Sequence, residues 1–343
     1  MKLPTRYLLI APSLVFMGLF YFYPLASIFS LSFAPQDNAS FKGMEKLLSS
    51  AYYLRVLWFT FWQAAVSTIL TLLLALPAAY VFARYAFRGK DMLLNLTTIP
   101  FVLPTVVTAA AFSALLGSGG LVNAALMQLF GLDQPLIRLE HTVWFFLMAH
   151  VFYNFTVVLR LVGGFWARLP SQVHEAARML GATNRVVFLK VTLPLLAPAI
   201  LAASLLVFIF CFTSFGVVLS LGGPRLATIE VEIYRQAVHL FNLPVAAALS
   251  LVQILFTFGL MAAYTRLERR SSMALLPETT PKRTAVRLRP KDRLAINACL
   301  AGMAILLGAP ILALFIRSIL TENGLGLVYY LALFENRAQS ILY

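Results

Sequence analysis

Few residues of the chain have the type and spacing needed for covalent or metal chemistry. The two cysteines, Cys211 and Cys299, each lie inside an apolar run, which excludes a disulfide framework and a Cys/His zinc site. No H-E-x-x-H zinc motif and no G-x-S-x-G nucleophile motif occurs. The four histidines are spread along the chain: His141, His150, His174 and His239. The sequence therefore predicts no catalytic residue, no metal site and no cofactor, and we do not expect an enzyme.

The polar segment from Gly164 to Lys190 has a spacing that does indicate a function. A long polar segment between two apolar runs is uncommon without one. Pro170 and Ser171 predict the start of a short helix with Ser171 as its N-cap, and Glu175 lies near the positive end of that helix. Gly181 predicts the end of the helix.

A second short helix is expected after this one. It begins at Thr183 or Asn184, continues through residues 187–189 and stops before Pro194. The two helices together are expected to project into the cytoplasm.

The spacing across both helices resembles the EAA loop of permease subunits in binding-protein-dependent ABC importers. Glu175-Ala176-Ala177 is followed by three residues, Gly181, nine residues and Val191-Thr192-Leu193-Pro194. The family pattern is E-A-A, three residues, G, nine residues and I-x-L-P, so that Val191 replaces Ile. In that family the loop is the coupling helix, which sits in a groove of the ATPase subunit. The resemblance implies that an ABC ATPase dimer is contacted by Glu175, Ala176, Ala177, Gly181, Leu193 and Pro194.

The residue types agree with such a contact. Ala176, Ala177 and Gly181 form a smooth surface that a partner's backbone can approach closely, and Glu175 is available to a basic group. The alternative is an ordinary solvated helix, because E-A-A triplets are common in helices; the full spacing favours coupling. Gly89-Lys90 lacks the upstream glycines of a Walker A loop, so ATP hydrolysis is assigned to another chain.

Two more segments resemble the iron(III)- and thiamine-type permeases, namely Ala149–Asn154 and Cys211–Glu230. Such permeases are commonly fused duplicates with one EAA loop in each half. The expected organisation is a first permease half of six spans at 1–265 with its EAA loop at 171–194, a basic cytoplasmic linker at 266–293, and the start of a second, incomplete half at 294–343. We therefore expect a truncated chain or a split gene, and a missing second permease half or homologous permease as partner.

Membrane spans are the elements that must position this loop. The 343 residues are 61% hydrophobic and 12% charged, whereas soluble domains are about half apolar and about a quarter charged. A spanning helix needs about 20 apolar residues. Seven charge-free runs are long enough: Tyr7–Gln36, Val56–Ala83, Met92–Leu132, His141–Leu159, Val191–Pro224, Gln236–Thr265 and Leu294–Ile316. The fold class is an all-α polytopic membrane protein with about seven helices, and the resemblance implies the Type I ABC importer permease fold.

The third run is long enough for two spans. We expect one, near Leu93–Leu116, because Gly117–Gly120 interrupts the run. Pro100 and Pro104 are expected to kink this span, either beside a water-filled path or through packing alone. Arg160, near the end of the fourth run, is expected to extend its side chain to the interface.

Basic residues predict the orientation. With the N-terminus inside, eighteen of the 27 Lys and Arg residues fall on the inner side, nine of them between Arg266 and Arg293, and eight fall outside. This bias is the positive-inside pattern of membrane proteins. The basic excess is therefore explained by topology, and no nucleic acid partner is expected. The basic linker at Lys282–Arg293 is expected to be a solvated flank, with contact with anionic membrane lipid as the alternative.

Polar residues inside the spans are candidates for a translocation path. His150 and Asn154 lie four residues apart on one helix face, and Thr213 and Ser214 lie in the fifth run. The alternative role is hydrogen bonding between helices or to the backbone, which is the more common role of such residues.

These features together predict the permease subunit of an ATP-driven importer in the bacterial plasma (inner) membrane, with a cytoplasmic N-terminus. The expected partners are the ATPase and an extracytoplasmic solute-binding protein, and the expected substrate is iron(III) first and thiamine second. Two alternatives remain: an ion-coupled secondary transporter, and a membrane scaffold or assembly subunit that does not transport.

Overall fold

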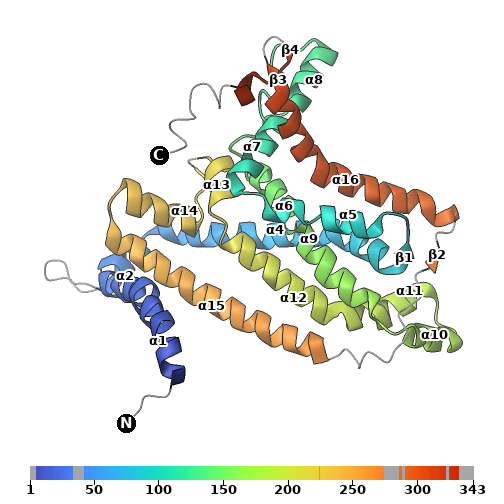
Figure 1. The fold of residues 1–343 in the computed structure, drawn as a ribbon, viewed down its shortest axis with the longest axis horizontal. Helices are drawn as coiled ribbons and strands as arrows, with labels where there is room; N and C mark the ends of the chain where they lie inside the picture. The colour runs from blue at the N-terminus through green and yellow to red at the C-terminus, as the bar shows by residue number, and fades with distance from the viewer. Residues whose placement is uncertain are drawn as a thin grey trace. The chain divides into compact units, whose positions relative to one another are not determined.

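The computed structural model describes residues 5–33, 42–223, 225–273, 286–287, 290–321 and 324–331 (Figure 1). Helices dominate these residues. The strands are two-residue segments: β1 (Tyr85–Ala86) pairs in parallel with β2 (Val286–Arg287), and β3 (Leu320–Thr321) pairs antiparallel with β4 (Gly324–Leu325). The prediction of an all-α protein is confirmed.

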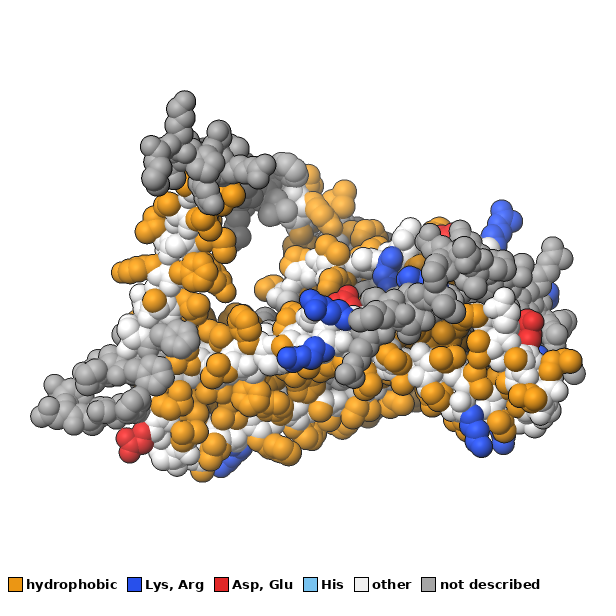
Figure 2. All heavy atoms as spheres, turned by 90° about the horizontal axis from the view of Figure 1, so that it is seen from below, with side chains coloured by type: hydrophobic (Ala, Val, Ile, Leu, Met, Phe, Trp, Pro, Cys, Tyr) orange, Lys and Arg blue, Asp and Glu red, His pale blue; other side chains and the backbone are white. Residues whose placement is uncertain are grey.

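Seven helices or helical runs in the described part of the chain are long and apolar enough to span a membrane, as predicted. They are Ile10–Ile28, Ala51–Arg84, Thr105–Phe130, Val143–Ala167, Asn184–Phe212, Leu243–Arg269 and Arg293–Ile319. Large apolar side chains such as Trp58, Phe258 and Phe315 are exposed, and Figure 2 shows many apolar side chains at the surface of the described residues. Exposed apolar surface of this kind is covered by lipid in a membrane protein.

The chain divides into two compact units, of which the first comprises residues 1–62 and 227–262. Its first helical run consists of α1 (Thr5–Met17), the π-helical turn η1 (Gly18–Phe22) and α2 (Tyr23–Phe33). The unit also contains α3 (Lys42–Ser49), the start of α4 (Ala51–Arg84), α14 (Ile229–Tyr234), the π-helical turn η3 (Arg235–His239) and most of α15 (Leu243–Met273). The Phe61 and Phe256 rings meet edge to face at 4.9 Å, which packs α4 against α15.

The second unit comprises residues 63–226 and 263–343. Before its central helix it contains α5 (Lys90–Leu96), α6 (Ile99–Val102), α7 (Thr105–Leu116) and α8 (Leu121–Phe130). The later elements are α10 (Ser171–Met179), α11 (Asn184–Val187), the π-helical turn η2 (Phe188–Thr192), α12 (Leu193–Phe212), α13 (Gly216–Leu221) and α16 (Pro290–Ile319). The central helix, α9 (Val143–Ala167), packs against α12 and buries Phe146, Phe152 and Phe155.

The rest of α4 packs on α9 through small side chains. Ala75, Ala78 and Ala79 are all buried. A methyl group added to Gly163 of α9 would already touch the Ala79 carbonyl oxygen at 3.5 Å. Small residues of this kind let two membrane helices approach closely, and the approach maximises van der Waals contact between them.

The third span differs from the prediction near Leu93–Leu116. The membrane-length run is Thr105–Phe130, and the residues before it form the short helices α5 and α6. Pro100 lies in the first turn of α6 and Pro104 directly precedes α7. Both prolines therefore start short helices instead of kinking one long helix, because proline fits a helix start, where no N–H partner is needed. The predicted interruption at Gly117–Gly120 is confirmed, since it separates α7 from α8.

Several other boundaries also differ. The fourth span continues to Ala167, so the polar segment starts at Arg168 and not at Gly164. The fifth run ends at Phe212, and the sixth span begins at Leu243 because Gln236 belongs to η3. Helix α15 continues to Met273, and residues 274–285 of the predicted linker lie outside the described residues.

The predicted stop before Pro194 is wrong. Helices α11 and α12 join through η2 into one run, Asn184–Phe212, which we call the α12 run. The turn η2 ends two residues before Pro194, just as η1 ends two residues before Pro24. A proline ring clashes with the carbonyl one α-helical turn earlier and cannot donate a hydrogen bond. A wider π-helical turn relieves that clash, and the helix continues.

Candidate functional site

Helix α10 carries the Glu-Ala-Ala motif and lies outside every candidate span. The residue before its first turn is Pro170, whose extended backbone (φ −61°, ψ 132°) places Ser171 inside the helix. The prediction of Ser171 as N-cap is therefore wrong by one residue. Proline suits this place because it pre-sets φ and lacks the N–H that would remain unpaired.

The end of α10 is formed by Gly181, as predicted. Gly181 has a φ of +83°, a left-handed conformation that costs glycine little. The N–H of Ala182 donates to the Ala177 carbonyl at 3.1 Å, and the N–H of Gly181 donates to the Arg178 carbonyl at 2.9 Å. This pair of hydrogen bonds is the Schellman motif, which stops a helix and turns the chain.

One face of α10 and the turn after it are open to solvent. Glu175 and Ala176 are exposed and Ala177 is half-buried. Met179 and Leu180 follow after Arg178, and each is 89% exposed. These two residues were not predicted as part of the site, although two large apolar side chains beside a Glu-Ala-Ala motif in a polar segment could have indicated a contact surface.

The other face of α10 contacts the α12 run. The imidazole Nε2 of His174 lies 2.9 Å from Thr192 Oγ1, and its Nδ1 lies 3.3 Å from the Pro170 carbonyl oxygen. One turn later, Arg178 Nη2 donates to Asn184 Oδ1 at 2.7 Å. Leu193 and Pro194 of the motif begin α12 and are both exposed.

Three of the four predicted path residues are linked by hydrogen bonds, since His150 contacts both Ser214 and Asn154. His150 is 2% exposed; its Nε2 lies 2.8 Å from Ser214 Oγ, and its Nδ1 lies 2.9 Å from Ser67 Oγ. Asn154 Nδ2 donates to the His150 carbonyl, and Thr213 Oγ1 donates to a carbonyl of its own helix, each at 2.9 Å. These are the interhelical and backbone hydrogen bonds that the alternative predicted, and a role in the path stays a prediction.

Ser67 belongs to a polar stripe on α4 that our sequence analysis missed. The stripe consists of fully buried residues at helical spacing: Thr60, Gln63, Ser67 and Thr71. Gln63 Nε2 donates to the Cys211 carbonyl at 2.8 Å. Residues three or four apart share one helix face, so the stripe could be read from the sequence.

Arg160 has specific partners in the structure, and its predicted extension to the interface stays a prediction. Its Nη2 donates to the Leu94 carbonyl at 2.9 Å and to Thr98 Oγ1 at 2.7 Å, and lies 3.3 Å from Asn95 Oδ1. The guanidinium is exposed and holds the end of α5 against α9.

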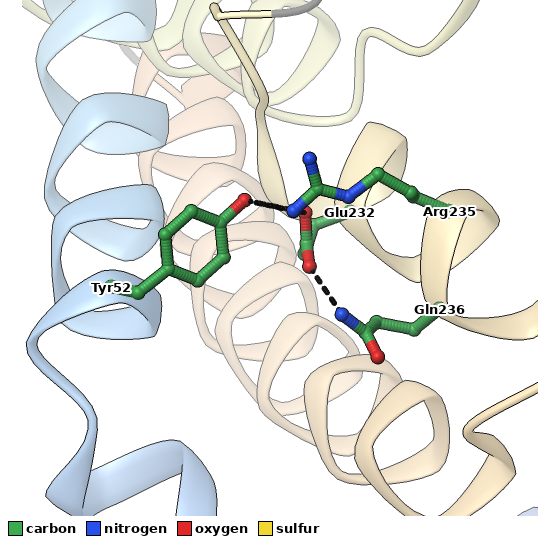
Figure 3. Close-up of polar contacts among 4 residues, drawn as sticks. All are labelled: Tyr52, Glu232, Arg235 and Gln236. Carbon is green, nitrogen blue, oxygen red and sulfur yellow. Dashed lines mark hydrogen bonds and ion pairs between the residues drawn. The ribbon is translucent and has the colours of Figure 1, made fainter. Parts of the chain in front are cut away.

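A polar network in the first unit was also missed (Figure 3). The carboxylate of Glu232, a fully buried residue of α14, accepts hydrogen bonds from Tyr52 Oη at 2.8 Å and Gln236 Nε2 at 2.7 Å, and pairs with Arg235 Nη2 at 2.9 Å. Arg235 also donates to Tyr52 Oη and lies over the Tyr52 ring. The network fixes α14 and η3 to the first turn of α4.

A second carboxylate of α14 has fewer partners. Glu230 accepts a hydrogen bond from Gln253 Nε2 of α15. Burial raises the pKa of the Glu230 carboxyl, and the hydrogen bond from Gln253 opposes that rise. Among the described residues, no group of three His, Cys, Asp or Glu side chains is arranged to hold a metal ion.

Several curated transport permeases are similar to this chain in sequence. The thiamine transport system permease protein ThiP of Brucella abortus (strain 2308) is 31% identical over 234 residues, which cover 68% of this chain and 42% of the relative. The protein of the same name from Escherichia coli (strain K12) is 32% identical, with 72% and 44% covered. The chain thus spans less than half the length of both. The putative 2-aminoethylphosphonate transport system permease protein PhnU of Salmonella paratyphi A is 26% identical, with 78% and 93% covered.

Solved structures show the same fold. A bacterial ABC transporter involved in the import of the acidic polysaccharide alginate has a chain that superposes with a TM-score of 0.62 at 17% identity, covering 78% of this chain and 95% of that one. The alginate transporter in complex with a pentasaccharide-bound periplasmic protein gives a TM-score of 0.57 at 16% identity. The predicted importer permease fold is therefore confirmed.

The family itself is shown by sequence. Residues 71–273 match the family described as the binding-protein-dependent transport system inner membrane component. This match includes α10 and the α12 run, together with the Glu-Ala-Ala motif. The chain is a multi-pass membrane protein, and it belongs to the family of binding-protein-dependent transport system inner membrane components.

Proposed function

We propose that the chain is a permease subunit of an ATP-driven importer in the bacterial inner membrane and that α10 docks on a cytoplasmic ABC ATPase. The observation that carries this proposal is the exposed surface of Glu175, Met179 and Leu180 at the end of a helix outside the spans. Two large apolar side chains that are 89% exposed, beside an exposed carboxylate, form a small surface suited to a protein partner.

The bias of basic residues predicts the side of the membrane on which this docking surface lies. With a cytoplasmic N-terminus, α10 lies on the inner side, where ATP is available, because it follows the fourth span. The Glu-Ala-Ala spacing supports the same role through its resemblance to the coupling helix. The chain itself then supplies the path and no hydrolysis.

The test is co-purification of the ATPase subunit from membranes that express variants of the docking surface. We expect Met179→Asp and Glu175→Arg to reduce the recovered ATPase about tenfold or more, because a buried Met side chain contributes about 1.5–3 kcal/mol. Both substitutions are expected to leave membrane insertion of the protein intact, since α10 is not part of any span.

The matched control is Leu136→Asp. Leu136 is 64% exposed in the segment between α8 and α9, which lies on the opposite side in the proposed orientation. This variant is expected to retain the ATPase. Equal recovery of ATPase with Met179→Asp and with the wild type would contradict the docking role.

We propose thiamine as the substrate, ahead of iron(III). The support is the identity of 31% and 32% to two ThiP permeases. A second candidate is 2-aminoethylphosphonate, because the match to PhnU covers 93% of that relative. Uptake of labelled thiamine, iron(III) and 2-aminoethylphosphonate by cells that express the system separates the three. Uptake that persists without ATP and requires an ion gradient would instead favour a secondary transporter.

The partners proposed for transport are an ATPase dimer, an extracytoplasmic solute-binding protein and a second permease half. An ATPase dimer offers two equivalent docking places, and the described residues contain one Glu-Ala-Ala helix. The second half is proposed as a further part of the same polypeptide or as a homologous subunit. The residues proposed for the path are His150, Asn154, Thr213 and Ser214. His150 and Asn154 lie inside the fourth span, and Thr213 and Ser214 directly follow the end of the fifth span at Phe212.

A further inference from the structure

Two polar contacts attach one face of α10 to the α12 run. His174 contacts Thr192 at the end of η2, and Arg178 contacts Asn184 at the start of α11. His174 and Arg178 lie four residues apart, so both project from the same face of α10. The helix is therefore held at two points along its length, and not only through the turn that connects it to α11.

Both ring nitrogens of His174 have a partner. Nε2 lies 2.9 Å from Thr192 Oγ1 and Nδ1 lies 3.3 Å from the Pro170 carbonyl oxygen, and the tautomer of the ring determines which group donates to Thr192 or accepts from it. Thr192 Oγ1 also donates to the Val187 carbonyl of its own run at 3.4 Å. Thr192 is 4% exposed, which shields this hydrogen bond from water. The imidazole thus connects the residue before α10 to a buried residue of the α12 run.

The attached face and the docking surface are different faces of α10. Glu175 and Met179 are also four residues apart, one position further along, and both are exposed. A partner that binds Glu175 and Met179 therefore leaves the His174 and Arg178 contacts in place.

We infer that His174 is a positioning residue that makes α10 and the α12 run move as one body. This inference depends on the proposed docking role of α10. Without the contact, α10 is joined to the α12 run mainly through the turn at Leu180–Thr183 and through Arg178. A force on the docking surface would then bend that turn before it moved the span. With the contact, a displacement of α10 is transmitted to Thr192 and onward to α12.

The test compares transport with ATP hydrolysis in one preparation. The complex of the permease, its ATPase and its binding protein is reconstituted in vesicles, and thiamine uptake and ATP hydrolysis are measured for His174→Ala, Thr192→Val and the double variant. Loss of one hydrogen bond should reduce thiamine imported per ATP hydrolysed about fivefold to tenfold while the ATPase remains bound. The double variant should lose no more than either single variant, because both remove the same contact.

Two further variants separate positioning from folding. His174→Gln retains a polar atom near the place of Nε2 and is expected to restore most of the coupling. Ser204→Ala removes a hydroxyl that only contacts the Ile200 carbonyl of its own helix, and is expected to have no effect. A merely structural role would reduce uptake, hydrolysis and bound ATPase in parallel.

The outcomes are distinguishable. A wild-type complex that recovers no ATPase or imports no thiamine would contradict the proposed function and this inference with it. A wild-type complex that couples normally, with His174→Ala at the same ratio of thiamine to ATP, would refute the positioning role alone. The same conclusion follows if His174→Gln behaves like His174→Ala.

Discussion

At the residue scale, the buried carboxylate of Glu232 is the most demanding group of the first unit. A buried carboxylate is costly unless it is paired and fully hydrogen-bonded. Tyr52, Arg235 and Gln236 supply these partners. Glu232 is therefore one of several groups that hold α14 and η3 on α4, together with the contacts of Arg235 with Tyr52 and of the Ile229 N–H with Thr60 Oγ1.

Glu232→Ala is expected to destabilise the protein by about 2 kcal/mol, less than the roughly 3–5 kcal/mol of a fully buried pair because the Arg235 side chain is 39% exposed. Thermal unfolding in detergent measures the change as a lower Tm. Glu232→Ala combined with Arg235→Ala should cost less than the sum of both single changes, because the double variant leaves no unpaired charge.

The control for this prediction is Glu45→Ala. Glu45 is an exposed residue of α3 in the same unit, so its loss should leave Tm nearly unchanged. Strictly additive effects of Glu232→Ala and Arg235→Ala would show that the ion pair contributes nothing.

At the element scale, the small-residue face of α4 determines how closely α9 can pack. Ala79→Leu is expected to destabilise the second unit by about 1–3 kcal/mol, because the added atoms have no room beside Gly163. The measurement is the yield and Tm of folded protein in detergent. The matched control is Leu73→Ala: Leu73 is on the same helix and 63% exposed, so its truncation should be tolerated. A tolerated Ala79→Leu would contradict the close approach.

The number of spans could be predicted from the sequence because lipid requires long apolar helices, and charged residues interrupt such runs clearly. The start of the third span could not be predicted from the sequence, since Pro100 and Pro104 are compatible with both a kinked helix and a helix start. The Gly181 turn was predictable because glycine is the residue that adopts a positive φ at low cost. In contrast, Tyr52 and Glu232 are 180 residues apart, and a pairing over that distance depends on tertiary structure. The same holds for Arg160, whose partners Leu94 and Thr98 are 66 and 62 residues away in the sequence.

At the scale of the whole molecule, the charge bias predicts one orientation in the membrane. Reporter fusions after Arg88, Arg138, Leu180, Arg225 and Met273 should report inside, outside, inside, outside and inside, because each pair is separated by one of the seven helical runs. Alkaline phosphatase is active outside and green fluorescent protein inside, so the two reporters give opposite readings at each site. Two neighbouring fusions on the same side would refute the span assignment, and a complete inversion would place α10 away from ATP.

The π-helical turn η2 also determines how the residues before and after it are oriented around the axis of the α12 run. Asn184 and Thr192 are eight residues apart, whereas two turns of α-helix take about seven, and the wider turn adds about one residue. Asn184 and Thr192 therefore fall on the same side of the helix, two turns apart. For this reason the single short helix α10 can contact both of them. If η2 relaxed into regular α-helix, Thr192 would rotate by about 80° away from Asn184. Pro194, two residues after η2, thus keeps the two contact residues Asn184 and Thr192 on one side of the helix. A change from π-helical to α-helical winding at η2 would make a linear displacement of α10 rotate α12.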